Sequence, residues 1–255
     1  MSLRLTKENK NWVRRPDATH MGSDRSPDLS QKVDQIKRTY SLKRDGICSR
    51  LKEFEKLWSD GNDEEIFDEL AFCILTPQSK AKICWGSIES LKEKGLLLKG
   101  DAEQIEKELS GVRFRNKKAR YIVSARKFFT NNGRICIKPA LSQFNPVRKK
   151  APSELSNEVY KCRGWLVQNI NGLGYKEASH FLRNIGFGEK IAILDRHILK
   201  NLKQIGIIEQ IPESISRAKY LQIEKKMAEF ARQIDIPISH LDLLLWYKET
   251  GEIFK

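Results

Sequence analysis

The spacing of hydrophobic residues along the chain predicts helices almost throughout. Apolar residues recur at helical intervals over Gln31–Trp58, with a break expected near Asp45-Gly46, and again over a second helix that Asp63 is predicted to cap. Proline disfavours helix at the residue before it, so the second helix should end at Thr76-Pro77-Gln78-Ser79. The chain shows neither an alternating strand pattern nor a solenoid repeat. We therefore expect an all-α fold.

Further helices are predicted by the same spacing down to the end of the chain. Asn131-Asn132-Gly133 should end one of them, and residues 134–153 are expected to form a long connector because they are polar and contain several prolines. The remaining predicted helices lie near 79–93, 101–109, 116–129, 154–169, 177–184, 196–205, 214–233 and 238–248.

A short glycine turn stands between two of the predicted helices. Gly172 and Gly174 flank Leu173, and a helical run begins directly after them. Glycine tolerates positive φ and leaves backbone N–H groups uncovered, so the turn places amides at a helix N-terminus, where a phosphate group binds well. Such turns also serve as simple helix caps. This feature alone therefore leaves DNA binding and plain capping both open.

Two ionisable residues accompany this turn. Lys176 falls in the first turn of the following helix, where a positive charge is slightly unfavourable beside the helix dipole. Asp195 follows nineteen residues later, after an apolar run, and is predicted to cap the next helix because aspartate is a preferred N-cap residue. A lysine and a carboxylate beside a phosphate cradle are also the groups that DNA base excision requires. We expect Asp195 to serve both purposes.

The overall charge favours a polyanionic partner. The chain has 47 lysine and arginine residues against 33 aspartate and glutamate residues, a net charge of +14. The first twenty residues are polar and end near a His20-Met21 junction that is typical of a cloning site, so we interpret residues 1–28 as a vector-derived or disordered leader. One basic segment is a candidate for phosphate contacts, although such runs are more often plain solvated surface; it comprises Arg113, Arg115, Lys117, Lys118, Arg120, Arg126 and Lys127.

Cysteine spacing and hydropathy exclude several other classes. The five cysteines are widely spaced, with no C-x-x-C pair or Cys/His cluster, so neither a zinc site nor a cubane iron–sulfur cluster is indicated. We predict no metal and no other cofactor, and we expect reduced thiols. No apolar run approaches the length of a membrane span and no signal-peptide pattern is visible, so an intracellular, cytoplasmic protein is expected.

Gln78 and the end of the chain are further candidates. An enzyme that flips a nucleotide needs a side chain to fill the gap in the base stack, and Gln78 is a candidate, although most such turns have no function. Ile253 and Phe254 immediately precede the last residue, which indicates that the tail packs down instead of fraying. A docked tail would deliver the carboxylate and the ammonium group of Lys255 together into a pocket.

Taken together, these residues resemble a known family. The turn Gly172-Leu173-Gly174-Tyr175-Lys176 with Asp195 resembles the helix-hairpin-helix, Gly/Pro-rich loop, Asp superfamily of DNA glycosylases, whose iron–sulfur branch is excluded by the missing C-terminal cysteines. Within it, residues 174–184 and the blocks 195–198 and 246–250 are similar to type 2 8-oxoguanine DNA glycosylase/AP lyases. The resemblance covers about 31–255. One departure is a slightly long interval between Lys176 and Asp195, at the turn Gly186-Phe187-Gly188.

The resemblance implies a glycosylase unit over 29–255 with two helical lobes and a DNA-binding cleft. One lobe would comprise about 29–70 and 196–255, and the other about 71–195, with the helix-hairpin-helix near 159–185. The family's activity is the excision of 8-oxoguanine from duplex DNA, followed by β-elimination at the abasic site. Lys176 would attack C1′ and form a Schiff base, while Asp195 would accept a proton or stabilise charge on the sugar. Gly172 and Gly174 would hold the DNA backbone.

Base selection requires one further contact. 8-Oxoguanine carries a hydrogen on N7, where guanine has an acceptor, so a selective site needs an acceptor facing N7. In the family this discrimination is associated with the C-terminal lysine, which is Lys255 here, and the Lys255 carboxylate or its neighbouring backbone would accept the N7 hydrogen. Trp246 and Asp242 would wall the pocket or form hydrogen bonds in it, although Trp246 is equally well read as a core residue.

Two other functions remain open from the sequence. The first is a non-catalytic helix-hairpin-helix module that grips DNA phosphates, which would need neither the Lys176 and Asp195 pair nor an ordered C-terminus. The second is a glycosylase of the same fold that acts on another lesion, such as an oxidised pyrimidine. In each case the partner is double-stranded DNA, and we expect a monomer associated with the nucleoid.

Overall fold

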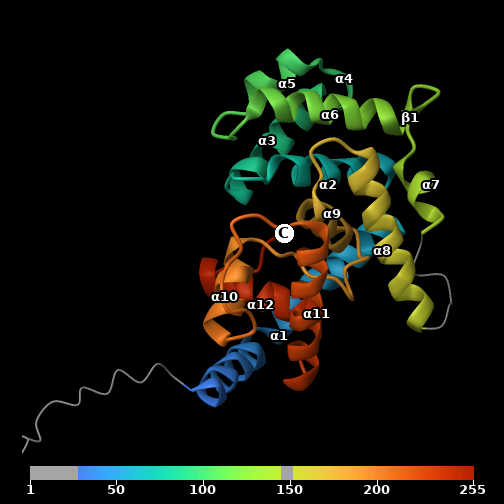
Figure 1. Ribbon diagram of the computed structural model, residues 1–255. Helices are drawn as coiled ribbons and strands as arrows, with labels where there is room; N and C mark the ends of the chain where they lie inside the picture. Colours follow the sequence, from blue (N-terminus) through green and yellow to red (C-terminus); the bar gives the residue numbers. More distant parts are fainter. Residues whose placement is uncertain (1–27, 145–151) are drawn as a thin grey trace, which may run out of the picture.

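Helices are nearly the only regular secondary structure in the described part of the chain, as the hydrophobic spacing predicts. The computed structural model describes residues 28–144 and 152–255, and its C-terminus lies between two groups of helices (Figure 1). The elements are α1 (Leu29–Asp60), α2 (Asp63–Leu75), α3 (Ala81–Glu93), α4 (Leu96–Lys99), α5 (Ala102–Glu108), α6 (Arg115–Phe129), β1 (Thr130–Asn131), β2 (Arg134–Ile135), α7 (Ile137–Ser142), α8 (Pro152–Asn169), α9 (Tyr175–Asn184), α10 (Arg196–Ile205), α11 (Arg217–Gln233) and α12 (Ile238–Thr250). The all-α prediction is confirmed. The predicted leader, apart from its last residue, lies outside the described residues.

Helix α1 continues through Asp45-Gly46, so the predicted break there was wrong. A Cβ atom placed on Gly46 would lie 3.0 Å from Cδ1 of Ile253 in the C-terminal tail. The glycine therefore marks a close approach of the tail to the helix and does not end the helix.

The cap of α2 is Asn62, and the prediction of Asp63 was wrong by one residue. The Glu65 N–H donates to Oδ1 of Asn62 at 3.0 Å, and the Asn62 N–H donates to Oε2 of Glu65 at 2.8 Å. This reciprocal pair is a capping box, which satisfies two amides at the helix start. Asp63 instead accepts the Lys138 N–H at 2.6 Å and ties the helix to α7.

The predicted connector over 134–153 is partly folded. Thr130 pairs with Ile135 and Asn131 pairs with Arg134, so Asn132 and Gly133 form the two-residue loop of a hairpin, both with positive φ. Pro139 lies in the first turn of α7, where the missing N–H of proline has no intrahelical acceptor to lose. The connector prediction was therefore wrong over residues 134–142, and residues 145–151 lie outside the described part.

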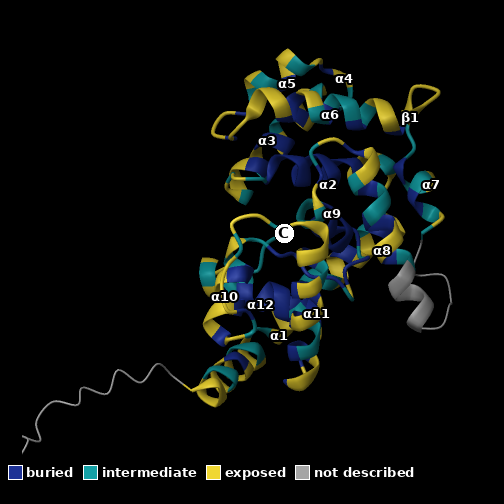
Figure 2. Ribbon diagram, in the orientation of Figure 1, coloured by how far each residue is buried: buried dark blue, intermediate teal, exposed yellow. Residues whose placement is uncertain are grey.

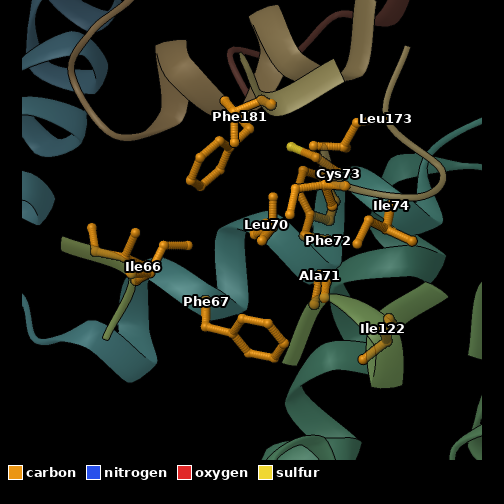
Figure 3. Packing of buried hydrophobic residues seen from close by; sticks show 14 of the residues in the cluster. Ile66, Phe67, Leu70, Ala71, Phe72, Cys73, Ile74, Ile122, Leu173 and Phe181 are labelled. Atoms are coloured by element: carbon orange, nitrogen blue, oxygen red, sulfur yellow. The ribbon is translucent and has the colours of Figure 1, made fainter. Parts of the chain in front are cut away.

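Buried hydrophobic residues form two clusters. The first is centred on α2, which is buried along most of its length, and includes residues of α3 to α9 (Figure 2). Side chains of α2 lie among Phe181 of α9, Leu173 of the glycine turn and Ile122 of α6 (Figure 3). The second cluster joins α10, α11 and α12 to Ile36 and Ile47 of α1. Each cluster is a hydrophobic core of its own, which is the packing that a two-lobed protein needs.

Helix α1 and the C-terminal tail connect the two clusters. Ile36 and Ile47 of α1 belong to the second cluster, whereas Trp58 belongs to the first and contacts Phe187 with the ring centroids 4.6 Å apart. In the tail, Ile253 packs against the second cluster and Phe254 packs against the first. The exact division into lobes at the boundaries given above stays a prediction.

Helices α8 and α9 and the turn between them form a helix-hairpin-helix. Gly172 has φ of +89°, and a Cβ atom there would lie 2.5 Å from Cδ2 of Tyr121 on α6. Both the left-handed backbone and the close ring require glycine at this position. The turn at Gly186 is also tightly packed, since a Cβ atom on Gly186 would lie 2.8 Å from the backbone of Glu55.

The hairpin geometry can be tested by replacing Gly172 with alanine. Gly133 is the matched control, because it also has positive φ but has open space where a Cβ atom would lie, so Gly133→Ala carries the backbone cost alone. We expect Gly133→Ala to lower the free energy of unfolding by about 1–2 kcal/mol and Gly172→Ala to lower it by more, because the Tyr121 ring must also move. Urea unfolding measures both. Equal losses would show that Tyr121 does not constrain the turn.

Candidate active site

Lys176 is the second residue of α9 and its ammonium group is held by two side chains. Nζ lies 3.1 Å from Oε1 of Glu177 and 3.4 Å from Oγ1 of Thr76, the residue that ends α2. The side chain is 24% exposed, so it is packed at the helix start but open to a substrate. An ammonium group has three donors, and these two contacts leave one of them for another partner.

Glu177 is a residue of the site that the sequence reasoning missed. Its Oε2 accepts the Gly174 N–H at 3.2 Å, so the same carboxylate caps α9 and contacts the Lys176 ammonium group. A glutamate at the third position of a helix is a capping signal that the sequence offers. The structure corrects one point about the glycines. Gly174 is extended, with φ of −89°, and its amide is already occupied, whereas Gly172 has the left-handed backbone.

Asp195 caps α10, as predicted. Its Oδ1 accepts the N–H groups of His197 and Ile198, each at 2.8 Å. Among the described residues, the other carboxylate oxygen has no hydrogen-bond partner. The cap therefore fixes the carboxylate in place and leaves Oδ2 available.

The residues before Asp195 form an extended segment whose backbone is held by buried side chains. The Ala192 N–H donates to Oε1 of Glu224 at 2.9 Å, and the Ile193 N–H donates to Oδ1 of Asp242 at 3.1 Å. The Tyr220 hydroxyl donates to the Ala192 carbonyl at 2.7 Å and accepts the Leu194 N–H at 3.3 Å. Side chains thus replace the ladder that a neighbouring strand would provide.

Tyr220 connects the two candidate catalytic residues indirectly. Its ring packs against Tyr175, which precedes Lys176, with the centroids 5.7 Å apart, while its hydroxyl holds the segment that precedes Asp195. Within the described part of the chain, Lys176 and Asp195 form no ion pair with each other. The structure therefore holds both residues at helix starts around one buried tyrosine and leaves their side chains apart.

An ion pair lies behind this tyrosine. Both terminal nitrogens of Arg163 donate to the carboxylate of Glu224, at 2.7 and 2.8 Å, and Arg163 also donates to Oγ of Ser179 on α9 at 3.0 Å. Burial disfavours the charge of Arg163, but the hydrogen bonds and charge of Glu224 outweigh this and raise the pKa of the guanidinium group. The pair fixes α8 and α9 to α11.

Asp242 is buried and both of its carboxylate oxygens contact the protein. Oδ2 lies 2.8 Å from Arg183, and Oδ1 accepts the Ile193 N–H. Burial raises the pKa of Asp242 to about 6, although Arg183 and the backbone N–H favour the charged form. In this arrangement Asp242 supports the segment that leads to Asp195. Its predicted part in base recognition stays a prediction.

Lys255 folds inward at the end of the chain. Its Nζ pairs with Oε1 of Glu69 on α2 and lies 3.2 Å from the ring centroid of Trp85. The side chain is 15% exposed, so the predicted docking of the tail is confirmed. The pairing partner, Glu69, lies 186 residues away along the chain, and the sequence held no sign of it.

Trp246 is partly exposed on α12. Its ring meets His197 edge-on, with the centroids 5.2 Å apart, so it lies beside the start of α10 and Asp195. Its indole N–H is buried and has no hydrogen-bond partner in the described part of the chain. Nε of the buried Arg163 also lacks a partner, so this feature does not separate a pocket residue from a core residue, and the part of Trp246 in base recognition stays a prediction.

Gln78 is exposed and has φ of +54°, a left-handed conformation that is uncommon for a residue other than glycine. Lys118 holds the loop that carries Gln78. Its Nζ donates to the carbonyls of Leu75 and Pro77, each at 2.7 Å, and to Oγ of Ser79 at 3.1 Å. Burial lowers the pKa of Lys118 to about 8, and the charge of Lys176 acts in the same direction. A strained, exposed side chain on a braced loop is consistent with the predicted role of Gln78.

Two residues of the predicted phosphate-binding segment are used inside the protein. Lys118 is buried, as described above, and Arg126 donates to the carbonyls of Leu97 at 3.0 Å and Gly100 at 2.6 Å. Burial therefore removes Lys118 from the candidates for phosphate contacts, and the guanidinium group of Arg126 is bound to backbone carbonyls of the protein. The same region contains an exposed aromatic residue that the sequence reasoning missed, Phe114, with φ of +57° and the Arg113 guanidinium group 5.5 Å from its ring centroid.

The described residues show no sign of a membrane span or a metal centre. None of the described helices combines the length with the apolar character that a span requires. In the same part of the chain, no three His, Cys, Asp or Glu residues gather into a possible metal site.

Comparison with known proteins agrees with the resemblance in the sequence. A family model described as 8-oxoguanine DNA glycosylase matches residues 47–236. The 8-oxoguanine DNA glycosylase/AP lyase of Fusobacterium nucleatum is 44% identical over 222 residues, which is 87% of this chain and 97% of that protein. The protein of the same description from Methanocaldococcus jannaschii is 40% identical over 230 residues, covering 89% of this chain and 99% of the relative.

A solved structure gives the same result for the fold. The Methanocaldococcus jannaschii 8-oxoguanine glycosylase/lyase, crystallised with a 15mer DNA that contains 8-oxoguanine, superposes with a TM-score of 0.72 at 36% identity. The match covers 87% of this chain and the whole of that chain.

The neighbouring lysines of α6 provide a test of the corrected basic segment. Lys118→Met should lower the free energy of unfolding by about 2–4 kcal/mol, because one buried and two partly buried acceptors lose their donor. Lys117→Met is the matched control, since Lys117 is exposed, and it should leave stability unchanged. Lys117→Met should instead reduce the slope of log affinity against log salt by about 0.9 for duplex DNA if Lys117 contacts a phosphate. Equal stability of the two variants would contradict the buried role of Lys118.

Proposed function

This chain belongs to the 8-oxoguanine DNA glycosylase family, and we propose that it excises 8-oxoguanine from duplex DNA and cleaves the resulting abasic site through a Schiff base at Lys176. The observation that carries the proposal is the position of the Lys176 ammonium group. It lies at the start of α9, in contact with the carboxylate of Glu177 and open to solvent. A lysine in this position can reach a sugar while a neighbouring base accepts its proton.

In the glycosylase step, the neutral amine of Lys176 attacks C1′, the bond from C1′ to the base breaks, and the base leaves. Lysine is a nucleophile only without its extra proton, so that proton needs an acceptor. We assign this role to Glu177, because its carboxylate touches Nζ. Asp195 then has the electrostatic role, since its free oxygen is held in place by the cap and can stabilise positive charge that develops on the sugar.

In the lyase step, the sugar ring opens and Lys176 becomes part of an imine at C1′. The imine draws electrons from the neighbouring carbon, so the hydrogen at C2′ is lost as a proton and the 3′ phosphate leaves. This is β-elimination, and the imine formed with Lys176 is what drives it. Glu177 is near enough to the imine nitrogen to exchange protons during these steps.

Access to C1′ requires the damaged nucleotide to leave the base stack. Gln78 is exposed on a loop beside Thr76, which touches Lys176, so its side chain is suitably placed to fill the gap in the stack. Phe114 is exposed on the adjoining loop, which is linked to the Gln78 loop by a hydrogen bond from the Arg113 N–H to Oγ of Ser79 at 3.0 Å. Aromatic side chains stack on bases, and Phe114 is therefore a second candidate for contact with the opened duplex.

Base recognition is assigned to the end of the chain. We propose that the terminal carboxylate of Lys255 accepts the N7 hydrogen of 8-oxoguanine, which guanine does not have. Trp246 supports the proposal because its ring lies against His197, beside Asp195. We also propose that the protein works as a monomer on the DNA of the nucleoid, and the net charge of +14 suits this polyanionic partner.

Two alternatives predict different chemistry. A non-catalytic helix-hairpin-helix module would bind duplex DNA without forming a covalent intermediate. A glycosylase for another lesion would form the intermediate on a substrate other than 8-oxoguanine. The paired contacts of Lys176 with Glu177 and Thr76 favour an enzyme over a binding module, because phosphate binding alone needs no ordered lysine.

The central experiment is borohydride trapping on a duplex with a single 8-oxoguanine. The wild type should form a covalent adduct, whereas Lys176→Gln should bind the same duplex without forming one, because an amide is not a nucleophile of this kind. Asp195→Asn should form the adduct more slowly, by about 100-fold or more, because one electrostatic contact in the transition state is lost. Denaturing gels measure the adduct.

The alternatives are separated by further lanes of the same experiment. An adduct on a duplex with an oxidised pyrimidine, but none with 8-oxoguanine, would favour the second alternative. Binding of the damaged duplex by the wild type with no adduct on any substrate would favour the binding module.

The assignment of the terminal carboxylate predicts the effect of a C-terminal extension. A short peptide added after Lys255 removes the carboxylate at that position and should reduce the preference for 8-oxoguanine over guanine. Excision from matched duplexes under single-turnover conditions measures the preference. An extended protein with wild-type selectivity would contradict the assignment.

A further inference from the structure

The ammonium group of Lys255 is enclosed by two residues that no part of the proposed reaction uses. Glu69 on α2 pairs with Nζ, and Trp85 on α3 presents its ring face to the same nitrogen, with the centroid 3.2 Å away. The contact of an ammonium group with a tryptophan face is attractive, and it is stronger when water is excluded. The end of the side chain is thus held by charge on one side and by a ring on the other.

Glu69 is a rigid anchor. It is 3% exposed and lies on α2, where its neighbours belong to the first hydrophobic cluster. Its second oxygen, Oε2, accepts a hydrogen bond from Nδ2 of Asn184 at 2.9 Å. A buried carboxylate is stable only with partners of this kind, and here Lys255 supplies the positive charge that pairs with it.

The residues around this pair hold the last turn of the chain in place. Ile253 and Phe254 pack against different hydrophobic clusters, so the tail is fixed on both sides immediately before Lys255. Asn184 in turn accepts hydrogen bonds from Arg183, at 3.2 and 3.1 Å, and Arg183 pairs with Asp242. One line of buried polar contacts therefore joins the end of the chain to the segment that leads to Asp195.

The position of the Lys255 ammonium group matters because guanine and 8-oxoguanine differ at N7. An ammonium group has three donors and no acceptor. N7 of guanine is an acceptor, whereas N7 of 8-oxoguanine carries a hydrogen and is a donor. A free Lys255 ammonium group beside N7 would therefore bind guanine and repel the damaged base, which is the opposite of the required selectivity. The carboxylate of the same residue has the required preference.

We propose that Glu69 is a specificity-determining positioning residue, which holds the Lys255 ammonium group against Trp85 and away from the base, so that the terminal carboxylate alone faces N7. This proposal rests on the proposed function, because it concerns base selection by the same site. Glu69 does not touch the substrate. It acts by fixing which end of Lys255 the substrate meets.

The test is Glu69→Gln, which keeps the shape and the hydrogen bond to Asn184 and removes the charge that binds the ammonium group. Single-turnover excision is measured on matched duplexes with 8-oxoguanine or guanine at one position, and strand cleavage is measured on a preformed abasic site. We expect the ratio of the 8-oxoguanine rate to the guanine rate to fall by about tenfold, the effect of one misdirected hydrogen bond. Cleavage of the abasic site should be unchanged, because no base is present to be read.

Lys82→Gln is the matched control. It breaks another ion pair of the C-terminal tail, between Lys82 and Glu252 at 2.6 Å, but this pair is exposed and does not involve Lys255. The control should keep the wild-type ratio. Unchanged selectivity in Glu69→Gln would overturn the proposal. Equal losses on all three substrates would overturn it as well, because they would indicate a general structural role.

A second pair of variants applies if Glu69→Gln does not fold. Lys255→Arg keeps a positive charge for Glu69, whereas Lys255→Met removes it, and both keep the terminal carboxylate. Methionine has no donor that could meet N7 of guanine, and Glu69 can hold the arginine, so both variants should keep the wild-type preference for 8-oxoguanine. Loss of the preference in Lys255→Met contradicts the proposal, because the ammonium group would then take a positive part in recognising the base. A failure of the proposed function is distinct from these outcomes, since the wild type itself would then release no 8-oxoguanine and form no adduct.

Discussion

The arrangement of the site depends on the backbone of residues 192–194, which is buried without a helix or a strand to pair with. An unpaired buried amide costs about 1–3 kcal/mol, so such a segment persists only if side chains take the place of a ladder. Glu224, Tyr220 and Asp242 do this here. The carboxylates among them are charged acceptors, and each is balanced by a buried arginine, Arg163 for one and Arg183 for the other.

This constraint explains why the site is built from helix starts. The buried segment delivers Asp195 to the start of α10 with its backbone already satisfied, so the cap can hold one carboxylate oxygen and leave the other free. The same buried groups reach α9, because Arg163 contacts Ser179 and Tyr220 packs against Tyr175. The two helix starts therefore share one support. The supporting groups lie in the core, whereas the side chains of Lys176 and Asp195 stay partly exposed, and such support holds them in a precise arrangement.

Whether the sequence could predict a feature of the fold or the site depends on how far apart the interacting residues lie along the chain. Most helices, the position of the glycine turn and the cap at Asp195 are local patterns, and the sequence predicted them, although it missed that Glu177 occupies the Gly174 amide. Gly46 and Pro139 were misread because their usual local meaning is overridden by packing, in one case against the tail and in the other by a position in a first helical turn. The contacts of Lys118 and Lys255 span 39–43 and 186 residues, and no local pattern indicates such partners.

Three lysines in the structure show why charge alone could not assign the roles in the site. Lys118 uses its donors on three oxygen atoms of a loop and is 4% exposed, so no ligand can reach it. Lys255 is bound by a carboxylate and a ring, so its ammonium group is already occupied within the protein. Lys176 alone among them has a carboxylate that can accept a proton and a side chain that remains open. The chemical role of each ammonium group thus follows from what its partners leave free, and sequence composition counts all three as equal.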